Sequence, residues 1–497
     1  MKTTVAIFFV LVIIGCTASK TSYNPNGKFS PQQLQEDYTL FESILEESHP
    51  GLYWYTPKDS MDYYFEQGKL MLHDSLTETK FRNVLSYVVE KIRCGHTAVK
   101  PSKKFSKYMD TARAPIFPLT LKFWPDTAVI TSVLNRRDST IRGGVVTTID
   151  SRSINKIVDS LFQFLSADGF NLTHKYQTLS NRGAFGNIYT SVFGTKLRYQ
   201  ITYQDSLFQR KSVTVNSFVA RDTSRRAART EKKISPLQRR KMNLVSTRRL
   251  RFDSTMNIAY LDLNTFAKGY YLNSFFKRSF RQLKKKRVNN LVIDLRGNGG
   301  GSVSNSNLLT KYISQKPFKI ADSLYALRKG SKYGLYQQNH LLNWLFLVFF
   351  THKKSDGYYH FRYFEGKYFK PKKRNHFDDD VYVLTGGNTF SASTLFVDAV
   401  KHQNNVTIIG EETGGGAYGN NAWLIPDVIL PNTRVRFRLP LFRLVINKNL
   451  PKGRGIMPEV QALPTVNDIR KGVDFKMLKA KELIQAKENK FISKEMP

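Results

Sequence analysis

Residues 288–301, VNNLVIDLRGNGGG, indicate the architecture of the C-terminal half of the chain. The apolar run at 291–293 is typical of a strand buried on both faces, and the glycines after it mark a tight turn. A helical pattern follows at 305–313, NSNLLTKYI. Further candidate strands lie at 256–266, 380–386 and 405–412, and a further candidate helix at 391–402. Strands that alternate with helices predict an α/β fold with a largely parallel sheet covered by helices.

The turn after this strand offers several unhindered backbone N–H groups at the carboxyl edge of the sheet. Such a turn can hold a phosphate, but no Lys-Ser or Lys-Thr pair follows it and the G-x-G-x-x-G spacing is absent. Nucleotide binding is therefore disfavoured. The favoured interpretation is that Gly299 or Gly300 donates to an oxyanion.

A second stretch, NTFSASTLFVDAV at 388–400, places Ser391 between an apolar strand and an amphipathic helix. A hydroxyl there lies at the positive end of the helix dipole, with free N–H groups nearby. Those features suit a nucleophile for acyl transfer, with the N–H of Ala392 as an oxyanion donor. Serine is also a common helix N-cap, and the position alone favours that ordinary role.

The N-terminal third divides into two patterns. Residues 31–105 show helical spacing at 34–45 and 78–92 and deliver His96 on a loop, RCGHTAVKPS. Residues 106–215 alternate like strands and include a glycine turn and an amphipathic helix. This second region resembles a PDZ-like module, which binds an extended peptide at a sheet edge. A plain α+β insert is the alternative.

The remaining segments connect or modify a core at 256–470. Residues 216–255 form a basic linker, in which 221–251 carry twelve Lys or Arg against Asp222 and Glu231. An insert at 320–375 contains NWLFLVFF, which is too short to span a membrane. This run is interpreted as a buried lid, with a lipid-contacting surface as the alternative. A hairpin is expected at 422–446 and a C-terminal helix at 471–497.

Residues 1–16, MKTTVAIFFVLVIIGC, have the charged start and short apolar run of a signal peptide. The end of this segment resembles a bacterial lipobox, which predicts lipidation of Cys16, followed by a tether at 17–30. An ordinary secretory signal with a chance cysteine is the alternative. Cys94 is the only other cysteine, so lipidation of Cys16 would leave no disulfide within the chain, and Cys94 is expected to be a small buried residue.

The formal net charge of +38 invites a nucleic-acid hypothesis. The basic residues are dispersed, however, and the aromatic residues form no stacking motif, so nucleic acid is not expected as a partner. Dispersed positive charge on a lipidated protein suits attraction to anionic membranes. A generally basic proteome is the alternative explanation.

Four motifs occur in order: CGHT (94–97), VIDLRGNGGG (292–301), TFSAS (389–393) and IIGEETGGG (408–416). Together with the PDZ-like segment they resemble the C-terminal processing (tail-specific) serine peptidases. The resemblance implies an α/β fold with a ClpP/crotonase-like peptidase core, an N-terminal helical region and the inserted PDZ-like α+β module. It also implies that Ser391, rather than Ser393, is the nucleophile.

The chain departs from the better-known members, whose serine is paired with a lysine. Gly416 stands at the lysine position, and Lys401 lies roughly 15 Å along the helix from Ser391. His402 is no nearer. His96 matches the histidine of the tricorn-type core peptidases, although Gly95 replaces the serine before it, so the resemblance makes His96 the general base.

The residue that orients His96 is left open. Glu459 is one possible acid partner, whereas Glu411 and Glu412 are expected to steady the glycine loop. His49 competes as a base but precedes a Pro-Gly turn, which favours packing or substrate contact. No cluster has zinc-like spacing, so neither a metal nor a cofactor is expected.

These patterns predict a serine peptidase that hydrolyses envelope proteins or peptides. It would be lipid-anchored in the bacterial cell envelope, in the outer membrane facing the periplasm. The alternative is a catalytically inactive lipoprotein that binds peptides on the same fold. Substrate sequence, endopeptidase or carboxypeptidase preference, periplasmic or surface display and oligomeric state are not predicted.

Overall fold

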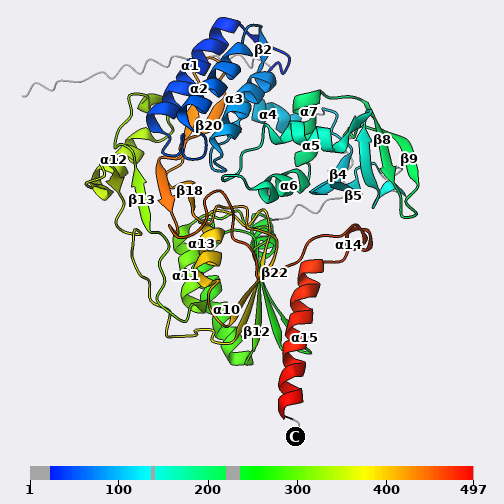
Figure 1. Ribbon diagram of the computed structural model, residues 1–497, viewed down its shortest axis with the longest axis vertical. Coiled ribbons are helices and arrows are strands. Elements are labelled where there is room, and N and C mark those ends of the chain that lie inside the picture. The colour runs from blue at the N-terminus through cyan, green and yellow to red at the C-terminus, as the bar shows by residue number, and fades with distance from the viewer. Residues whose placement is uncertain (1–22, 113, 136–139, 220–234, 496–497) are drawn as a thin grey trace, which may run out of the picture.

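The computed structural model describes residues 23–112, 114–135, 140–219 and 235–495 (Figure 1). Cys16 and the lipobox lie outside these residues, as does the first part of the basic stretch, 221–234. No helix of the described residues is long and apolar enough to cross a membrane.

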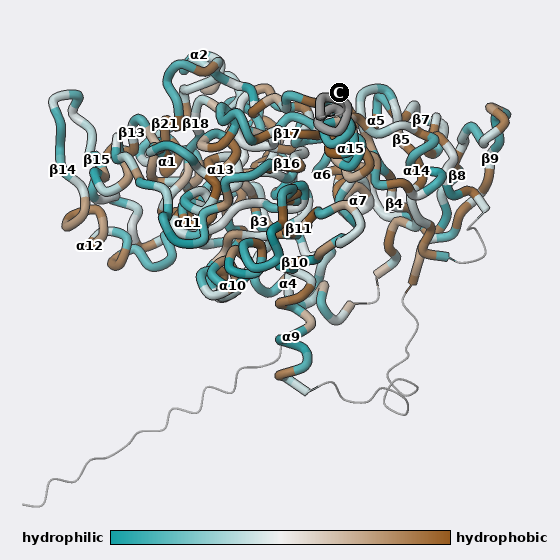
Figure 2. The backbone as a smooth tube through the Cα atoms, turned by 90° about the horizontal axis from the view of Figure 1, so that it is seen from below, coloured by the Kyte–Doolittle hydropathy of each residue, from teal (hydrophilic) through white to brown (hydrophobic). Residues whose placement is uncertain are grey.

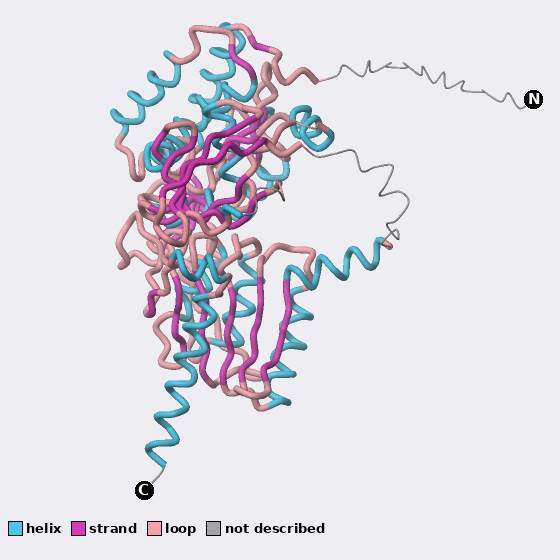
Figure 3. The backbone as a smooth tube through the Cα atoms, turned by 90° about the vertical axis from the view of Figure 1, so that its right-hand side faces the viewer, coloured by secondary structure: helices cyan, strands magenta, loops and turns pink. Residues whose placement is uncertain are grey.

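A six-stranded sheet forms the C-terminal core in the order β10-β11-β12-β16-β17-β22. The five strands from β11 to β22 are parallel and β10 is antiparallel. Figure 3 shows these strands side by side in the lower part of the molecule. The predicted parallel sheet is therefore confirmed. Its strands are β10 (Arg248–Asp253), β11 (Ile258–Leu263), β12 (Asn290–Asp294), β16 (Asp380–Thr385), β17 (Val406–Gly410) and β22 (Val460–Gln461).

Helices cover both faces of this sheet because alternate apolar side chains point to opposite sides. Leu291 and Ile293 pack against α10 (Leu272–Lys286), α11 (Val303–Ile313) and α13 (Ala392–Val400). Val292 between them faces α15 (Phe475–Glu495), which contributes Ala480 and Ile484 to a smaller core. α15 corresponds to the predicted C-terminal helix, and the short α14 (Val466–Lys471) precedes it.

The N-terminal helices pack against strands from the far end of the chain. The predicted helices at 34–45 and 78–92 are confirmed by α1 and α3. The loop that carries His96 leads into β3, which pairs with β20 beside β19. These elements are α1 (Pro31–Ser48), α2 (Lys58–Leu70), α3 (Glu78–Ile92), α4 (Lys103–Thr111), β1 (Lys28–Phe29), β2 (Leu76–Thr77), β3 (Val99–Lys100), β19 (Asp427–Ile429) and β20 (Arg436–Arg438).

The region after α4 is an α+β unit with its own hydrophobic core. Its antiparallel sheet has the order β4-β5-β6-β8-β9, and β7 pairs with β6. α6 lies beside the edge strand β4, where the N–H of Phe123 donates to Ser180 Oγ at 2.8 Å. The elements are β4 (Leu119–Trp124), β5 (Thr127–Val133), β6 (Val145–Ile149), β7 (Arg152–Ser153), β8 (Arg198–Gln204), β9 (Arg210–Asn216), α5 (Ile154–Phe162), α6 (Leu172–Ser180) and α7 (Ala184–Phe193), with α9 (Pro236–Thr247) after them.

The segment expected to be one hairpin at 422–446 is divided instead between two sheets. β19 and β20 pair with β3, whereas β21 (Phe442–Val445) joins β18 (Gly419–Ala422) and β13 (Ser323–Ala326). β14 (His352–Lys353) and β15 (Tyr359–His360) complete the second sheet, and η2 (Gly334–Tyr336) and α12 (His340–Phe350) lie beside it.

The interpretation of NWLFLVFF as a buried lid is wrong. This run forms most of α12, and Leu347 is the one buried residue of that helix. Trp344, Phe349 and Phe350 are exposed. A uniformly apolar run cannot distinguish a buried helix from an exposed one by periodicity, which explains the error.

Candidate active site

Ser391 lies at the turn between β16 and α13 with φ 56° and ψ −121°. A side chain in this left-handed region strains the backbone. Ser391 occupies the N-cap position, yet its side chain makes no capping hydrogen bond. The ordinary capping role of the Ser391 hydroxyl is therefore excluded. The residue is partly exposed.

The glycine turn after β12 packs directly against Ser391. Gly300 has φ 94°, and a Cβ placed on it would lie 2.7 Å from the Ser391 Cβ. Only glycine allows this approach. The N–H of Gly300 already donates to Asn298 Oδ1 at 3.0 Å. The expectation that Gly300 donates to an oxyanion is therefore corrected: Gly300 allows the close approach of Ser391 instead. Among the described residues the N–H groups of Gly299 and Ala392 have no hydrogen-bond acceptor, so both are free to donate to a ligand.

Hydrogen bonds fix the two turns to each other. Thr389 Oγ1 donates to the Leu295 carbonyl at 2.9 Å and accepts from the Gly386 N–H at 3.1 Å. The N–H of Phe390 donates to the Asn298 carbonyl at 3.1 Å. These bonds join the end of β12 to the turn before Ser391.

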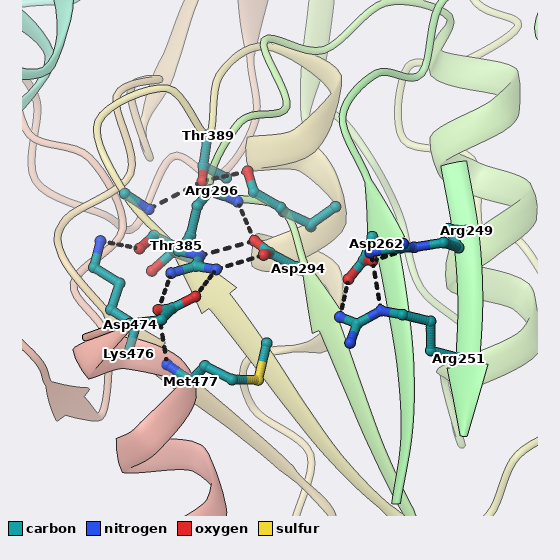
Figure 4. Close-up of polar contacts among 12 residues, drawn as sticks. Arg249, Arg251, Asp262, Asp294, Arg296, Thr385, Thr389, Asp474, Lys476 and Met477 are labelled. Carbon is teal, nitrogen blue, oxygen red and sulfur yellow. Dashed lines mark hydrogen bonds and ion pairs between the residues drawn. The ribbon is translucent and has the colours of Figure 1, made fainter. Parts of the chain in front are cut away.

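Arg296 fastens the base of the same turn to the C-terminal segment (Figure 4). Its guanidinium donates to Asp294 at 2.6 and 3.0 Å and to Asp474 at 2.5 and 2.8 Å. Lys476, close by, donates to the Thr385 carbonyl at 2.8 Å and to Glu411 at 2.5 Å. Two charged side chains thus hold the strand ends beneath the site.

His96 reaches the serine turn through Phe390. The two rings lie 4.8 Å apart, and Phe390 directly precedes Ser391. Both ring nitrogens of His96 are buried and have no hydrogen-bond partner among the described residues. Burial, followed by the charges of Arg438 and His174, lowers the pKa of His96 to about 3. The ring is therefore neutral near pH 7, the state that can accept a proton.

Asp168 joins the His96 loop to the glycine turn at 414–416. Its carboxylate accepts from the Gly95 N–H at 2.8 Å and from the Gly416 N–H at 3.1 Å. Burial raises the pKa of Asp168 to about 6, although the two N–H donors oppose the shift. Sequence reasoning missed this residue because Asp168 comes from the inserted α+β unit and carries no motif.

His174, which was also missed, lies on the same aromatic ring. It stacks on Phe390 at 4.8 Å, and its Nδ1 is 2.7 Å from the Gly387 carbonyl. This contact makes Nδ1 the protonated nitrogen. His174 thus supports the turn before Ser391.

None of the other predicted residues forms a hydrogen bond with the His96 ring, whose nitrogens are unpaired within the described part of the chain. His49 Nε2 lies 2.7 Å from Thr97 Oγ1, which agrees with the expected packing role. Lys401 donates to the Met457 carbonyl at 2.9 Å. The Glu459 carboxylate accepts from the Ile408 N–H at 2.6 Å, so the structure does not bring Glu459 to His96.

The two glutamates of the glycine loop have the supporting role that was expected. Glu412 accepts from Arg454 at 2.9 and 3.0 Å and from the Gly455 N–H at 2.7 Å. Glu411 is bound by Lys476. No group of three or more His, Cys, Asp or Glu that could hold a metal occurs in the described part of the chain.

Ser391 borders a cavity of about 350 Å³. Its walls are largely apolar and include Val303, Phe364 and Trp423. Asn420 also lines it, is 2% exposed, and has neither its amide nitrogen nor its amide oxygen paired among the described residues. An unpaired buried amide costs free energy, which points to a partner supplied by a ligand.

A strained, uncapped serine beside free backbone N–H groups on an α/β sheet defines a site of the serine-hydrolase type. Residues 257–461 match the profile of Peptidase family S41, and this domain belongs to that family. The chain is accordingly a serine-type peptidase, as predicted from its motifs. No curated protein matches the chain.

Solved structures support the fold over nearly the whole chain. Mature CPAF is 14% identical with a TM-score of 0.64, covering 94% of this chain and 99% of that one. CPAF complexed with lactacystin is 15% identical with a TM-score of 0.63, covering 92% and 98%. The photosystem II D1 C-terminal processing protease is 12% identical, covers 89% and 98%, and has a TM-score of only 0.39. At these identities the CPAF likeness concerns the fold alone.

Proposed function

We propose that Ser391 is the nucleophile of this peptidase and that His96 is its general base. One observation carries the proposal: the strained Ser391 turn is in contact, through Phe390, with a buried neutral imidazole whose nitrogens are unpaired. Ser391 Oγ would attack the scissile carbonyl while His96 takes its proton. The N–H groups of Ala392 and Gly299 would hold the oxyanion. His96 would then protonate the leaving amine, and water would hydrolyse the acyl-enzyme.

Peptide is proposed to approach along the inserted α+β unit, interpreted as PDZ-like. The arrangement of edge strand β4 beside α6 supports this, because peptides add to such edges. A cavity of about 340 Å³ lies there, lined by Phe123, Tyr176 and Arg454 among others. The parallel sheet with α10, α11 and α13 on one face supports the further proposal of a ClpP/crotonase-like core.

The proposed location is the bacterial envelope, with Cys16 lipidated and the enzyme in the outer membrane facing the periplasm. The lipobox pattern and the net charge of +38 support this. Envelope proteins or peptides would then be the substrates.

The second candidate is a peptide-binding protein without turnover. It is favoured by the pKa of His96, which burial lowers to about 3, because so weak a base removes a proton poorly. Gly416 at the expected lysine position favours it as well.

A fluorophosphonate probe separates the two candidates. Wild-type protein should be labelled, whereas Ser391→Ala and His96→Ala should not. Ser393→Ala is the matched control and should retain labelling, because Ser393 is buried on α13. A folded wild-type protein that stays unlabelled would support the binding protein, and labelling of Ser391→Ala would refute the assigned nucleophile.

A further inference from the structure

An exposed apolar surface surrounds α12. Its members, called the α12 patch, are large side chains that are 45–87% exposed. In Figure 2 the apolar colouring of α12 lies at one extremity of the molecule. The α12 patch consists of Leu335, Leu341, Leu342, Trp344, Phe349 and Phe350.

The patch does not have the form of an ordinary amphipathic helix. Trp344 and Leu341, three residues apart, share one side of the helix, while Leu342 and Phe349 lie on another. A helix that is apolar on several sides needs an apolar medium around most of its circumference. Eleven residues extend only about 16 Å, so α12 can lie in a membrane interface but cannot cross it.

The surroundings of the patch are strongly basic. Residues 327–370 contain eight Lys or Arg against Asp356 and Glu365. Both acidic side chains are bound to His360, at 2.8 and 2.7 Å, and Glu365 also pairs with Lys354. Arg328 pairs with Glu47 at 2.9 Å. The other six basic side chains of this segment form no ion pair with the described residues, so positive charge predominates around α12. Apolar and aromatic side chains within a basic frame are the combination that binds anionic lipid surfaces.

An aromatic cluster connects α12 with the cavity beside Ser391. Phe346 contacts Phe361 at 5.2 Å, and Phe361 contacts Trp423 at 5.8 Å. Trp423 lines the cavity. Any partner that binds α12 would thus lie close to the wall of the cavity beside Ser391.

We propose that the α12 patch inserts into the interface of an anionic lipid bilayer. This binding is independent of lipidation at Cys16 and of the peptidase mechanism. It would hold the cavity close to the membrane surface.

The test uses the full chain with vesicles that contain brominated phosphatidylglycerol. Bromine quenches nearby tryptophan, and Trp344 reports on α12 even where residues 1–22 bind lipid by themselves. The Trp344→Phe variant keeps an aromatic side chain and identifies the part of the quenching that Trp344 contributes. That part should be large in phosphatidylglycerol vesicles, weak in phosphatidylcholine vesicles, and reduced at high salt.

A triple variant, Leu342→Ser with Phe349→Ser and Phe350→Ser, should reduce the Trp344 signal by roughly tenfold or more. Leu207→Ser with Phe208→Ser is the matched control, because these side chains are exposed on the β8–β9 turn. In this control variant the quenching of Trp344 by the brominated lipid should equal that in the wild-type protein. The proposal is overturned if Trp344 is not quenched, if phosphatidylcholine quenches it equally, or if the triple variant keeps the signal. Sedimentation that shows a dimer lost in the triple variant, without quenching, would assign the patch to a second copy.

Discussion

At the scale of single residues, Ser391 illustrates how the local backbone serves the chemistry. Its positive φ accompanies the absence of a capping hydrogen bond, which leaves the hydroxyl available for the proposed attack. The conformation costs about 1–3 kcal/mol for a residue with a Cβ. The surrounding hydrogen bonds of Thr389 and Phe390 maintain it.

Replacing Ser391 with glycine should therefore stabilise the protein while abolishing hydrolysis. Glycine relieves the strain but loses more backbone entropy on folding, so a net gain of about 1 kcal/mol over Ser391→Ala is expected. Chemical denaturation of the two variants measures this difference. Equal stability would show that the turn is unstrained.

Protonation of Asp168 should lower the activity of the peptidase below about pH 6, which would appear as an acidic limb in the pH profile of kcat/KM. Below its pKa of about 6 the carboxyl is protonated, and one oxygen can no longer accept from Gly95 or Gly416. We expect kcat/KM to fall as the pH drops through 6. His96, with its pKa lowered to about 3, adds no limb there. Tyr55 and Cys94, which also interact with the Asp168 charge, have pKa values raised by burial and stay neutral.

Asp168→Asn should be slower and should lack this limb, and a limb that persists in the variant would belong to another group. The pKa shift of Asp168 affects stability in the opposite direction from its expected effect on activity. Folding raises this pKa from 3.8, so the folded state binds the extra proton between 3.8 and about 6. The contribution of Asp168 to the free energy of unfolding thus declines as the pH rises through that window.

At the scale of secondary-structure elements, the strand–turn–helix units were predictable because each is encoded locally. The apolar run at 291–293 and the glycines after it are sufficient to indicate a buried strand and its turn. The pairing of β3 with β20, and the split of 422–446 between two sheets, depend on contacts between distant segments. The exposure of α12 could likewise not be predicted from the local sequence pattern. Ser391 and His96 were proposed as site residues from motifs and remain proposals, whereas Asp168, His174 and Asn420 had no local signal.

Arg296 joins the end of β12 to the segment before α15, because it binds both Asp294 and Asp474. It should therefore be important for stability. Its removal leaves the Asp294 charge with the backbone N–H of residue 296 but without a cationic partner. Arg296→Ala should therefore lower the free energy of unfolding by about 3 kcal/mol. Arg251 makes a comparable fork to Asp262 but is 40% exposed (Figure 4). Arg251→Ala should cost about 1 kcal/mol or less. Equal losses in urea denaturation would contradict the special role of Arg296.

At the scale of the whole molecule, the cavity beside Ser391 is assembled from several separate elements. β18 supplies Asn420, α11 supplies Val303, and Phe364 follows β15. No single stretch of sequence contains the cavity, which is why neither its shape nor its apolar character could be predicted.

Asn420 offers a test of this cavity. If its amide binds the peptide backbone, Asn420→Ala should lower kcat/KM for peptides by about tenfold, the value of one hydrogen bond. The free energy of unfolding should stay constant or rise, since an unpaired buried amide is removed. Peptide hydrolysis together with thermal unfolding measures both. A destabilised variant with normal kcat/KM would make Asn420 a structural residue.

The position of α15 has a consequence for the biosynthesis of this peptidase. The His96 loop leaves the ribosome early, but the sheet that carries Ser391 gains its second covering layer from the last helix of the described chain. Asp474, which binds Arg296 beneath the site, emerges just before that helix. A nascent chain that ends before Asp474 would contain Ser391 and His96, the proposed catalytic residues, without these contacts. The turn before Ser391 would therefore gain its full support only once the segment from Asp474 through α15 has folded onto the sheet.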